Sequence, residues 1–227
     1  MNRAALRYCG DEPQSCEVAL PLTHFNVRRF NNLTTLPRRW YHAPPDEVAR
    51  RLLGKVLIRE IEGKILAGRI VETEAYFGVD DPAAHSAAGR TARNSVLFGP
   101  PGHAYVYFIY GVHYCLNVSC EPAGRAGCVL IRALEPLAGQ EMMLRNRGLK
   151  SGASARSLTG GPGKLCSALS ITRAENGCDM TARRAALRIA DDGCEAGEIV
   201  VTPRIGITKA ADRPLRFLLH GRACVSR

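Results

Sequence analysis

Two acidic residues and a tyrosine alternate with smaller residues in the stretch Arg69–Tyr76, whose sequence is RIVETEAY. Its apolar and β-branched residues predict a strand, and the side chains of a strand alternate between two faces. Glu72, Glu74 and Tyr76 therefore share one face. Two carboxylates are costly on a strand otherwise built for a core, so we expect them to face a wet cleft. Such a pair suits hydrolysis, because one can activate a water molecule while the other orients it or sets its neighbour's pKa. A solvated strand face is the alternative.

Four tyrosines fall within ten residues of a chain that is only 6% aromatic: Tyr105, Tyr107, Tyr110 and Tyr114. Tyr105 and Tyr107 share a strand face, and we expect Tyr105 to belong to the sheet. Tyr110 stands beside Gly111, where the strand must turn, so we expect it at a hairpin tip. An exposed aromatic wedge there can insert into a base stack. A tyrosine at the wet rim of a sheet is the alternative.

A polar loop after the acidic strand carries one histidine, His85, and then Arg90, Arg93 and Asn94 behind a glycine. Arginine and asparagine side chains commonly contact the phosphates of nucleic acids, and they also cap loops. The loop is therefore either a phosphate-binding segment or a structural one. A lone loop histidine is either a site residue or a surface residue.

The glycine-rich segment 158–165, LTGGPGKL, is close to a nucleotide-binding loop but fails its spacing. Leu158 stands where that motif needs glycine, and Leu165 stands where it needs serine or threonine. The segment instead predicts a loop that opens a helix, whose free N–H groups near Gly163, together with Lys164, grip one backbone phosphate. A plain glycine linker is the alternative.

Arg132 interrupts the apolar strand predicted over residues 129–134. An arginine in such a strand requires a carboxylate partner or a function. Glu74 is the candidate partner, whether the ion pair is catalytic or only structural.

The composition favours a protein that meets a polyanion, because the 227 residues carry a net charge of +10 and the pI is near 9.4. No segment has the length and apolarity of a membrane span, and the N-terminus does not read as a signal peptide, so a cytoplasmic location is expected. The nine cysteines are scattered and never form a Cys-x-x-Cys pair, which argues against a disulfide framework and a metal site.

The pattern along the chain predicts one mixed α+β domain with more strand than helix. Residues 1–35 are expected to form a loosely ordered N-terminal arm or to dock as a short strand or turn, and residues 36–227 to form the domain. Regular structure is expected to begin near Pro44, where a helix starts and ends before Gly54. The other expected elements are strands over 55–61, 64–77, 104–110, 115–119, 127–135, 186–190, 198–205 and 214–219, helices over 138–147 and 164–170, and a loop over 150–163.

Taken together and in order, these segments resemble the alkyladenine (3-methyladenine) DNA glycosylase family. The resemblance covers about residues 36–227. It is carried by LGKV (53–56), VETEAY (71–76), His85, GRTARN (89–94), FGPPG (98–102), YVYFIYG (105–111), NV (117–118), VLIRALEP (129–136), GGPGKLC (160–166) and VSR (225–227).

The resemblance implies a curved, barrel-like antiparallel sheet with surrounding helices, no cofactor and no metal. It implies that Glu74 is the general base that deprotonates the attacking water and that Arg132 helps hold this water. The substrate would be double-stranded DNA containing a damaged purine, and the protein is expected to be a monomer.

The further site residues follow by resemblance as well. Tyr76, His85 and Tyr107 would surround a base flipped out of the duplex, and Asn117 would reject normal guanine. Tyr110 would be the wedge that fills the gap, and the DNA backbone would be held by Arg90, Arg93, Gly163 and Lys164. Because no lysine accompanies Glu74 in its strand, we expect a monofunctional enzyme that leaves an abasic site.

Two other functions remain open from the residues alone. Glu72 and Glu74, about 7 Å apart on one strand face, could serve a sugar-directed glycoside hydrolase. A damaged-DNA-binding module without catalysis would use Tyr110 and the arginine loop. That second reading leaves the two acids unexplained, since carboxylates repel phosphate.

Overall fold

The computed structural model describes residues 27–226 of the chain. Most of the expected N-terminal arm, residues 1–26, lies outside the described residues. Its last part forms helix α1 (Val27–Asn31) and strand β1 (Thr34–Thr35). Within the described residues, regular structure therefore begins at Val27 and not near Pro44, because Phe30 is buried in a small core with Val56 and Ile58.

The other elements agree closely with the pattern of the sequence. The strands are β2 (Val56–Ile61), β3 (Lys64–Tyr76), β4 (Ala104–Ile109), β5 (His113–Ser119), β6 (Cys128–Ala138), β7 (Leu187–Asp191), β8 (Ile199–Thr202) and β9 (Arg216–Leu219). The helices are α2 (Pro45–Leu52), α3 (Gln140–Arg147), α4 (Ala155–Thr159) and α5 (Pro162–Ala168), with short 3-10 turns at Arg38–Tyr41, Ser95–Phe98 and Arg173–Glu175.

The loop predicted over 150–163 is wrong, because it contains α4 and the start of α5. The hydroxyl of Ser154 accepts a hydrogen bond from the Ser157 N–H and so caps α4. Pro162 occupies the first turn of α5, where its missing N–H costs nothing, so this helix begins two residues earlier than predicted.

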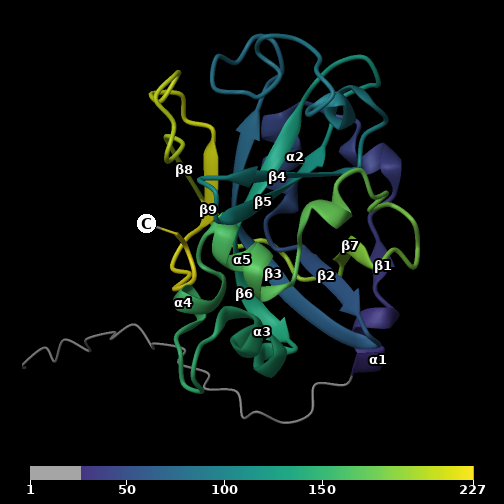
Figure 1. Ribbon diagram of the computed structural model, residues 1–227, viewed down its shortest axis with the longest axis vertical. Coiled ribbons are helices and arrows are strands. Elements are labelled where there is room, and N and C mark those ends of the chain that lie inside the picture. The colour runs from purple at the N-terminus through teal and green to yellow at the C-terminus, as the bar shows by residue number, and fades with distance from the viewer. Residues whose placement is uncertain (1–26, 227) are drawn as a thin grey trace, which may run out of the picture.

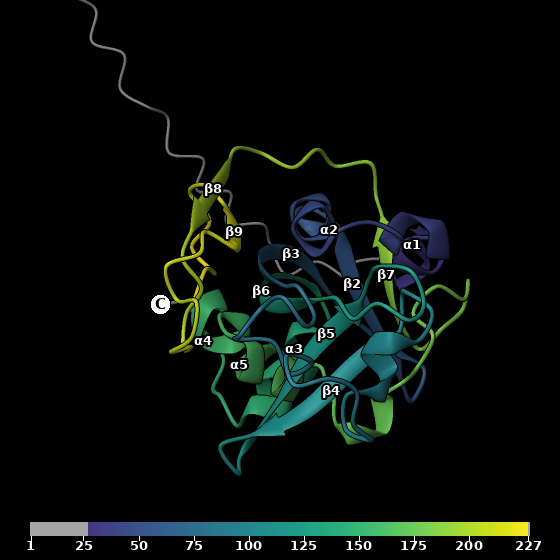
Figure 2. The same ribbon diagram turned by 90° about the horizontal axis from the view of Figure 1, so that it is seen from above.

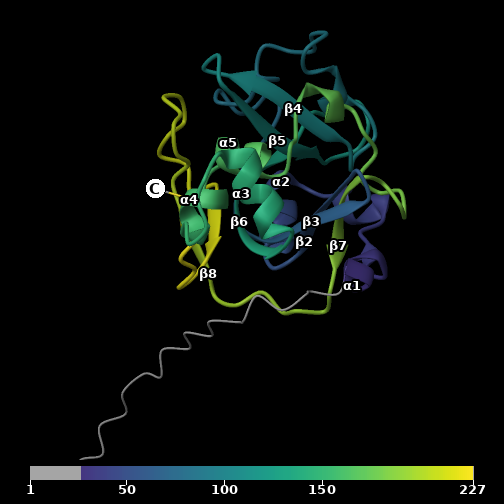
Figure 3. The ribbon, with the colours of Figure 1, turned by 60° about the horizontal axis from the view of Figure 1, so that its bottom comes forward.

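The nine strands of the described residues form one antiparallel sheet in the order β1-β7-β2-β3-β6-β5-β4, and β9 joins β3 to β8 (Figure 1). The long strand β3 pairs with β6 along one edge, and with β2 and then β9 along the other. Figure 3 shows β4 and β5 turned away from β2 and β7, so the sheet curls into a half-barrel. The expected α+β fold on a curved antiparallel sheet is confirmed.

Two tight turns follow from the sequence. Glu62 and Gly63 both have positive φ, +50° and +70°, which gives the hairpin between β2 and β3 the turn whose twist matches its strands. Tyr110 and Gly111 also have positive φ, +53° and +69°, and the N–H of Val112 donates to the carbonyl of Ile109 to close the hairpin between β4 and β5.

A bulge in β3 decides which side chains face the site. The register of β3 against β6 shifts on both sides of Glu72, so Ile70 and Val71 both pack into the main core. Beyond the bulge, the hydroxyl of Thr73 donates to the carbonyl of Ala49, which places α2 on that face. Glu72 and Glu74 alternate with Thr73 and thus face the opposite side of β3.

Helices α3, α4 and α5 form one group over β5 and β6, apart from α1 and α2 (Figure 2). Of this group, α5 contributes Pro162 and Gly163 to the wall of a cavity beside β3. Within residues 27–226, no helix combines the length and apolarity that a bilayer span requires.

Candidate active site

A cavity of about 320 Å³ opens beside the end of β3, at the small end of the range for ligand pockets. All four residues expected around a flipped base line it: Tyr76, His85, Tyr107 and Asn117. Arg132 lines it as well. The remaining wall is largely apolar or glycine and is formed by Ala83, Ala84, Leu97, Tyr105, Ile109, Tyr110, His113, Cys115, Cys128, Leu130, Pro162, Gly163, Ile205, Gly206 and Ile207.

Glu74 is completely buried directly behind this wall. One carboxylate oxygen accepts from the backbone N–H of Ile205 at 2.8 Å. The other accepts from the Tyr76 hydroxyl at 2.9 Å and lies 3.1 Å from Nη1 of Arg132. Two hydrogen bonds and one ion pair therefore hold this carboxylate, and all three partners, Tyr76, Arg132 and Ile205, belong to the cavity wall.

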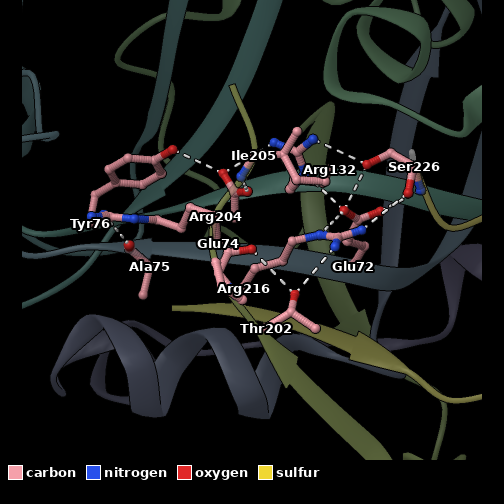
Figure 4. A network of polar contacts seen from close by, with 11 residues as sticks. Glu72, Glu74, Ala75, Tyr76, Arg132, Thr202, Arg204, Ile205, Arg216 and Ser226 are labelled. Atoms are coloured by element: carbon pink, nitrogen blue, oxygen red, sulfur yellow. Dashed lines mark hydrogen bonds and ion pairs between the residues drawn. The ribbon is translucent and has the colours of Figure 1, made fainter. Parts of the chain in front are cut away.

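Glu72 is also completely buried and is held by four donors (Figure 4). Its Oε1 accepts from Nε of Arg132 at 2.9 Å, from Nε of Arg216 at 2.7 Å and from the hydroxyl of Ser226 at 2.7 Å. Its Oε2 accepts from the Ser226 N–H at 2.6 Å. The expectation that both acids face a wet cleft is therefore wrong, because hydrogen bonds and arginines, and not water, compensate their burial.

Arg132 joins the two acids. It donates through Nε to Glu72, through Nη2 to the hydroxyl of Ser226 at 3.1 Å, and presents Nη1 to Glu74. Burial opposes the charge of this guanidinium, but the carboxylates of Glu74 and Glu72 outweigh it and raise its pKa. The predicted pair with Glu74 is present, and Glu72 is a second partner that the sequence did not indicate.

Aromatic rings form a further part of the cavity wall. Nδ1 of His85 lies 2.9 Å from the hydroxyl of Tyr105, and its ring meets that of Tyr107 edge to face, with 4.4 Å between centroids. Desolvation, and then the nearby charge of Arg93, lower the pKa of His85 below its ordinary value of 6.5, which favours the neutral imidazole. Burial raises the pKa of Tyr105 to about 12. Tyr105 lies in the sheet core as expected, although its hydroxyl contacts the site.

A buried ion pair that the sequence did not reveal supports this wall. Arg204 donates to both carboxylate oxygens of Asp81 and to the carbonyl of Ala75 at 3.0 Å, and both side chains are fully buried. The guanidinium also lies 4.6 Å from the centre of the Tyr76 ring. The pair fixes Tyr76 and the segment that brings the Ile205 N–H to Glu74. No periodic pattern surrounds Arg204, and a backbone donor has no side-chain signature, so neither could be found from sequence.

Tyr110 projects from the tip of the β4–β5 hairpin at the cavity rim, with 77% of its surface exposed. Val112 beside it is 67% exposed. This is the place that the sequence predicted for an aromatic wedge.

The expected phosphate-binding residues lie outside the cavity wall, except Gly163. Asn94 caps its loop, donating to the carbonyls of His85 and Gly89, and so takes the structural role of the two left open. The guanidinium carbons of Arg90 and Arg93 lie 6.0 Å and 5.8 Å from the rings of Phe98 and Tyr107, and both arginines are exposed.

Gly163 lies so close to His113 that a β-carbon there would come within 2.9 Å of the imidazole. Lys164 is partly buried, and its ammonium donates to the carbonyl of Arg156 at 3.4 Å. The two residues thus sit at the first turn of α5, where the sequence placed them.

Within residues 27–226, no three His, Cys, Asp or Glu side chains gather as a metal site, and the seven cysteines of that range are free thiols. Cys115 and Cys128 belong to the cavity wall, and burial raises the pKa of each thiol, that of Cys128 to about 12.

Comparison with known proteins identifies the family. The family model described as "Methylpurine-DNA glycosylase (MPG)" matches residues 39–223. A protein of Koribacter versatilis (strain Ellin345) named "Putative 3-methyladenine DNA glycosylase" is 59% identical over 195 residues, which cover 86% of this chain and 94% of that protein. Proteins of the same name from Methanocella arvoryzae (strain DSM 22066 / NBRC 105507 / MRE50) and Carboxydothermus hydrogenoformans (strain ATCC BAA-161 / DSM 6008 / Z-2901) are 48% and 47% identical, covering 86% and 85% of this chain and 97% and 98% of their own lengths. The resemblance in the sequence is thereby confirmed, and the chain belongs to the methylpurine-DNA glycosylase family.

Proposed function

We propose that this protein removes alkylated purines from duplex DNA by flipping the damaged base into the 320 Å³ cavity and hydrolysing its N-glycosidic bond with a water activated by Glu74. Membership of the family makes the chain a DNA glycosylase, a hydrolase of N-glycosyl bonds in DNA repair. The flipping of the damaged base, the activation of water by Glu74 and the abasic product go beyond what family membership establishes.

The observation that carries the proposal is the difference between the two acids. A carboxylate offers about four acceptor positions. Glu72 receives four hydrogen bonds, three of them from Arg216 and Ser226, which lie outside the cavity wall. Glu74 receives only two hydrogen bonds and one ion pair, all from residues of that wall, so an acceptor position beside the cavity is left for the proton of a water molecule. Glu74 is therefore assigned as the general base, and Glu72 is assigned a structural role.

Arg132 orients this water. Its Nη1 lies beside Glu74, and the residue is part of the cavity wall. A cation there attracts the oxygen of the water while Glu74 accepts its proton, so the nucleophile is held between two fixed groups. The Glu74 carboxylate also stabilises the positive charge that develops on the sugar as the bond breaks.

The walls of the cavity suit a purine. Tyr76, His85 and Tyr107 offer aromatic faces and edges for stacking, and the amide of Asn117 is held by the carbonyl of Tyr105 at 3.1 Å. A fixed amide at this position crowds the extra amino group of guanine, which adenine-type lesions lack. Extruding a base costs a few kcal/mol, and less for a damaged base that stacks and pairs poorly.

Tyr110 is assigned as the wedge that fills the gap in the duplex, because an exposed aromatic ring at a hairpin tip can replace a lost stacking partner. The exposed guanidinium groups of Arg90 and Arg93, and the first turn of α5 with Gly163 and Lys164, are assigned to the DNA backbone.

The product is an abasic site in an uncut strand. Strand cleavage by a glycosylase requires an amine nucleophile that forms a Schiff base. Among the residues that line the cavity in the described part of the chain there is no lysine, and the ammonium of Lys164 is engaged by a backbone carbonyl.

The test is base release from a duplex oligonucleotide carrying one alkylated purine, with wild type and Glu74→Gln compared. Wild type is expected to produce strand breaks only after alkali, and Glu74→Gln is expected to bind the duplex without producing them. Strand breaks without alkali would refute the monofunctional assignment, and undiminished release by Glu74→Gln would refute the assignment of the base.

A further inference from the structure

The last described residue, Ser226, reaches the centre of the buried charge network from the far end of the sequence. Three of its polar groups are engaged. The N–H and hydroxyl both donate to Glu72, the hydroxyl accepts from Nη2 of Arg132, and the carbonyl accepts from Nη2 of Arg216 at 3.1 Å. Only 8% of the residue is exposed. Figure 4 shows Ser226 beside Arg132 and Glu72, with dashed lines joining them.

We infer that Ser226 is a positioning residue for the glycosylase reaction, one that holds Arg132 so that its Nη1 faces Glu74 and the cavity. The inference rests on the proposed function, because Arg132 matters to catalysis only if it orients the water that Glu74 activates.

The geometry of a guanidinium carries the argument. The group is planar and rigid, so fixing two of its nitrogens fixes the third. Glu72 holds Nε and Ser226 holds Nη2, which leaves Nη1 as the nitrogen for Glu74. Nε and Nη2 are thus clamped, and the clamp sets the position of Nη1 beside Glu74.

The Ser226 hydroxyl also prevents Glu72 from competing with Glu74 for the guanidinium of Arg132. A guanidinium beside a carboxylate tends to form two parallel hydrogen bonds with it. The Ser226 hydroxyl takes Nη2 and donates to the same Glu72 oxygen that accepts from Nε. Without it, Nη2 loses its partner in a buried site, and Arg132 can rotate onto Glu72 and draw Nη1 away from Glu74.

The clamp is itself held from the strands at the edge of the sheet. Nε of Arg216, on β9, donates to Glu72, and Nη1 of Arg216 donates to the hydroxyl of Thr202, the last residue of β8, at 3.2 Å. This gives the buried acid Glu72 a role: it anchors Arg132 and Ser226 and takes no part in proton transfer.

The test compares Ser226→Ala, Ser226→Cys and Ser226→Thr under single-turnover conditions with saturating protein and a duplex containing one alkylated purine. Alanine removes the hydroxyl, cysteine keeps its size with a weak donor and acceptor, and threonine keeps the hydroxyl. We expect alanine and cysteine to slow base release about 10-fold or more, since a misplaced catalytic group is that costly. Threonine is expected to stay within about threefold of wild type on this account, and duplex affinity is expected to stay unchanged in all three.

A double variant separates this inference from the proposed function. In the Glu74→Gln background, Ser226→Ala is expected to cause no further loss, because both changes act on the same water. A lower melting temperature with an unchanged release rate for the folded alanine and cysteine variants would overturn the positioning role. So would a threonine variant as slow as alanine. Full release by Glu74→Gln alone would instead refute the proposed function.

Discussion

Replacing Glu72 by glutamine is expected to destabilise the protein strongly while leaving the general base in place. An amide has one acceptor oxygen and two N–H donors, so it cannot accept the four hydrogen bonds that Glu72 receives. If the amide oxygen points toward the two arginines, the amide NH₂ faces the N–H of Ser226, and two donors oppose each other. If the amide is turned the other way, its NH₂ faces the donors of Arg132 and Arg216.

The magnitude follows from these contacts. Each arginine loses its anionic partner at this position and keeps at most a hydrogen bond to a neutral amide oxygen, a loss of about 1 to 1.5 kcal/mol. The buried N–H of Ser226 is left without an acceptor, which costs about 1 to 3 kcal/mol. The total is about 3 to 6 kcal/mol, which corresponds to a fall in melting temperature on the order of 10 °C for a domain of this size.

Thermal unfolding followed by circular dichroism measures this loss, and single-turnover base release well below the transition measures what the folded variant can still do. We expect a large fall in melting temperature with release reduced far less than by Glu74→Gln. About 1 kcal/mol shifts the melting temperature of a domain of this size by about 2 to 4 °C. A melting temperature within about 2 °C of wild type would therefore refute the energies assigned to the Glu72 contacts. A stable Glu72→Gln protein without any release would show that the roles of the two acids are reversed.

Three further predictions follow from other parts of the site. Arg204→Met leaves the carboxylate of Asp81 buried without its partner and should cost about 3 to 5 kcal/mol in urea unfolding at pH 7. Burial, the largest single cause, raises the pKa of Asp81, but the hydrogen bonds and charge of Arg204 and the N–H groups of Phe77 and Ala83 together lower it below the ordinary value of 3.8. The stabilisation is therefore present above pH 3.8 and should vanish as the pH falls through the folded pKa. A difference from wild type that persists undiminished at low pH would contradict this. Tyr110→Ala should lower kcat/KM on a duplex containing a lesion by about 10-fold, since stacking one base is worth about 1 to 3 kcal/mol. The melting temperature should not change, because the ring is exposed. An unchanged kcat/KM would refute the role of Tyr110 as a wedge. An NMR titration should give His85 a pKa below 6.5, and Arg93→Ala should raise it only part of the way because desolvation is the larger cause; a value above 6.5 in wild type would contradict the neutral imidazole.

The sequence alone predicted what depends on local pattern. The acidic strand was expected from alternation and the turn at Tyr110 from glycine placement, and the structure contains both. The curled sheet was implied by the family resemblance and not by local pattern, and it is present as well. The four expected base-pocket residues line one cavity because neighbouring strands and the loop after β3 bring them together.

The network behind the cavity could not be predicted, because its members come from distant segments. Arg204 meets Asp81 across 123 residues, and Ser226 meets Glu72 across 154. The bulge that turns Glu72 toward the site is a shift of register between β3 and β6, and the composition of β3 gives no signal of it. Burial of both acids was missed for the same reason, since the donors that compensate it are not their neighbours in sequence.

The central claim is that Glu74 activates the attacking water. The most direct measurement is the single-turnover rate constant of Glu74→Gln with saturating protein and a duplex containing one alkylated purine. We expect it to fall by about 10² to 10⁴-fold, the usual contribution of a general base, while the affinity for the same duplex is retained. A rate constant within a few-fold of wild type in a folded variant would contradict the claim and would mean that another residue of the cavity is the general base.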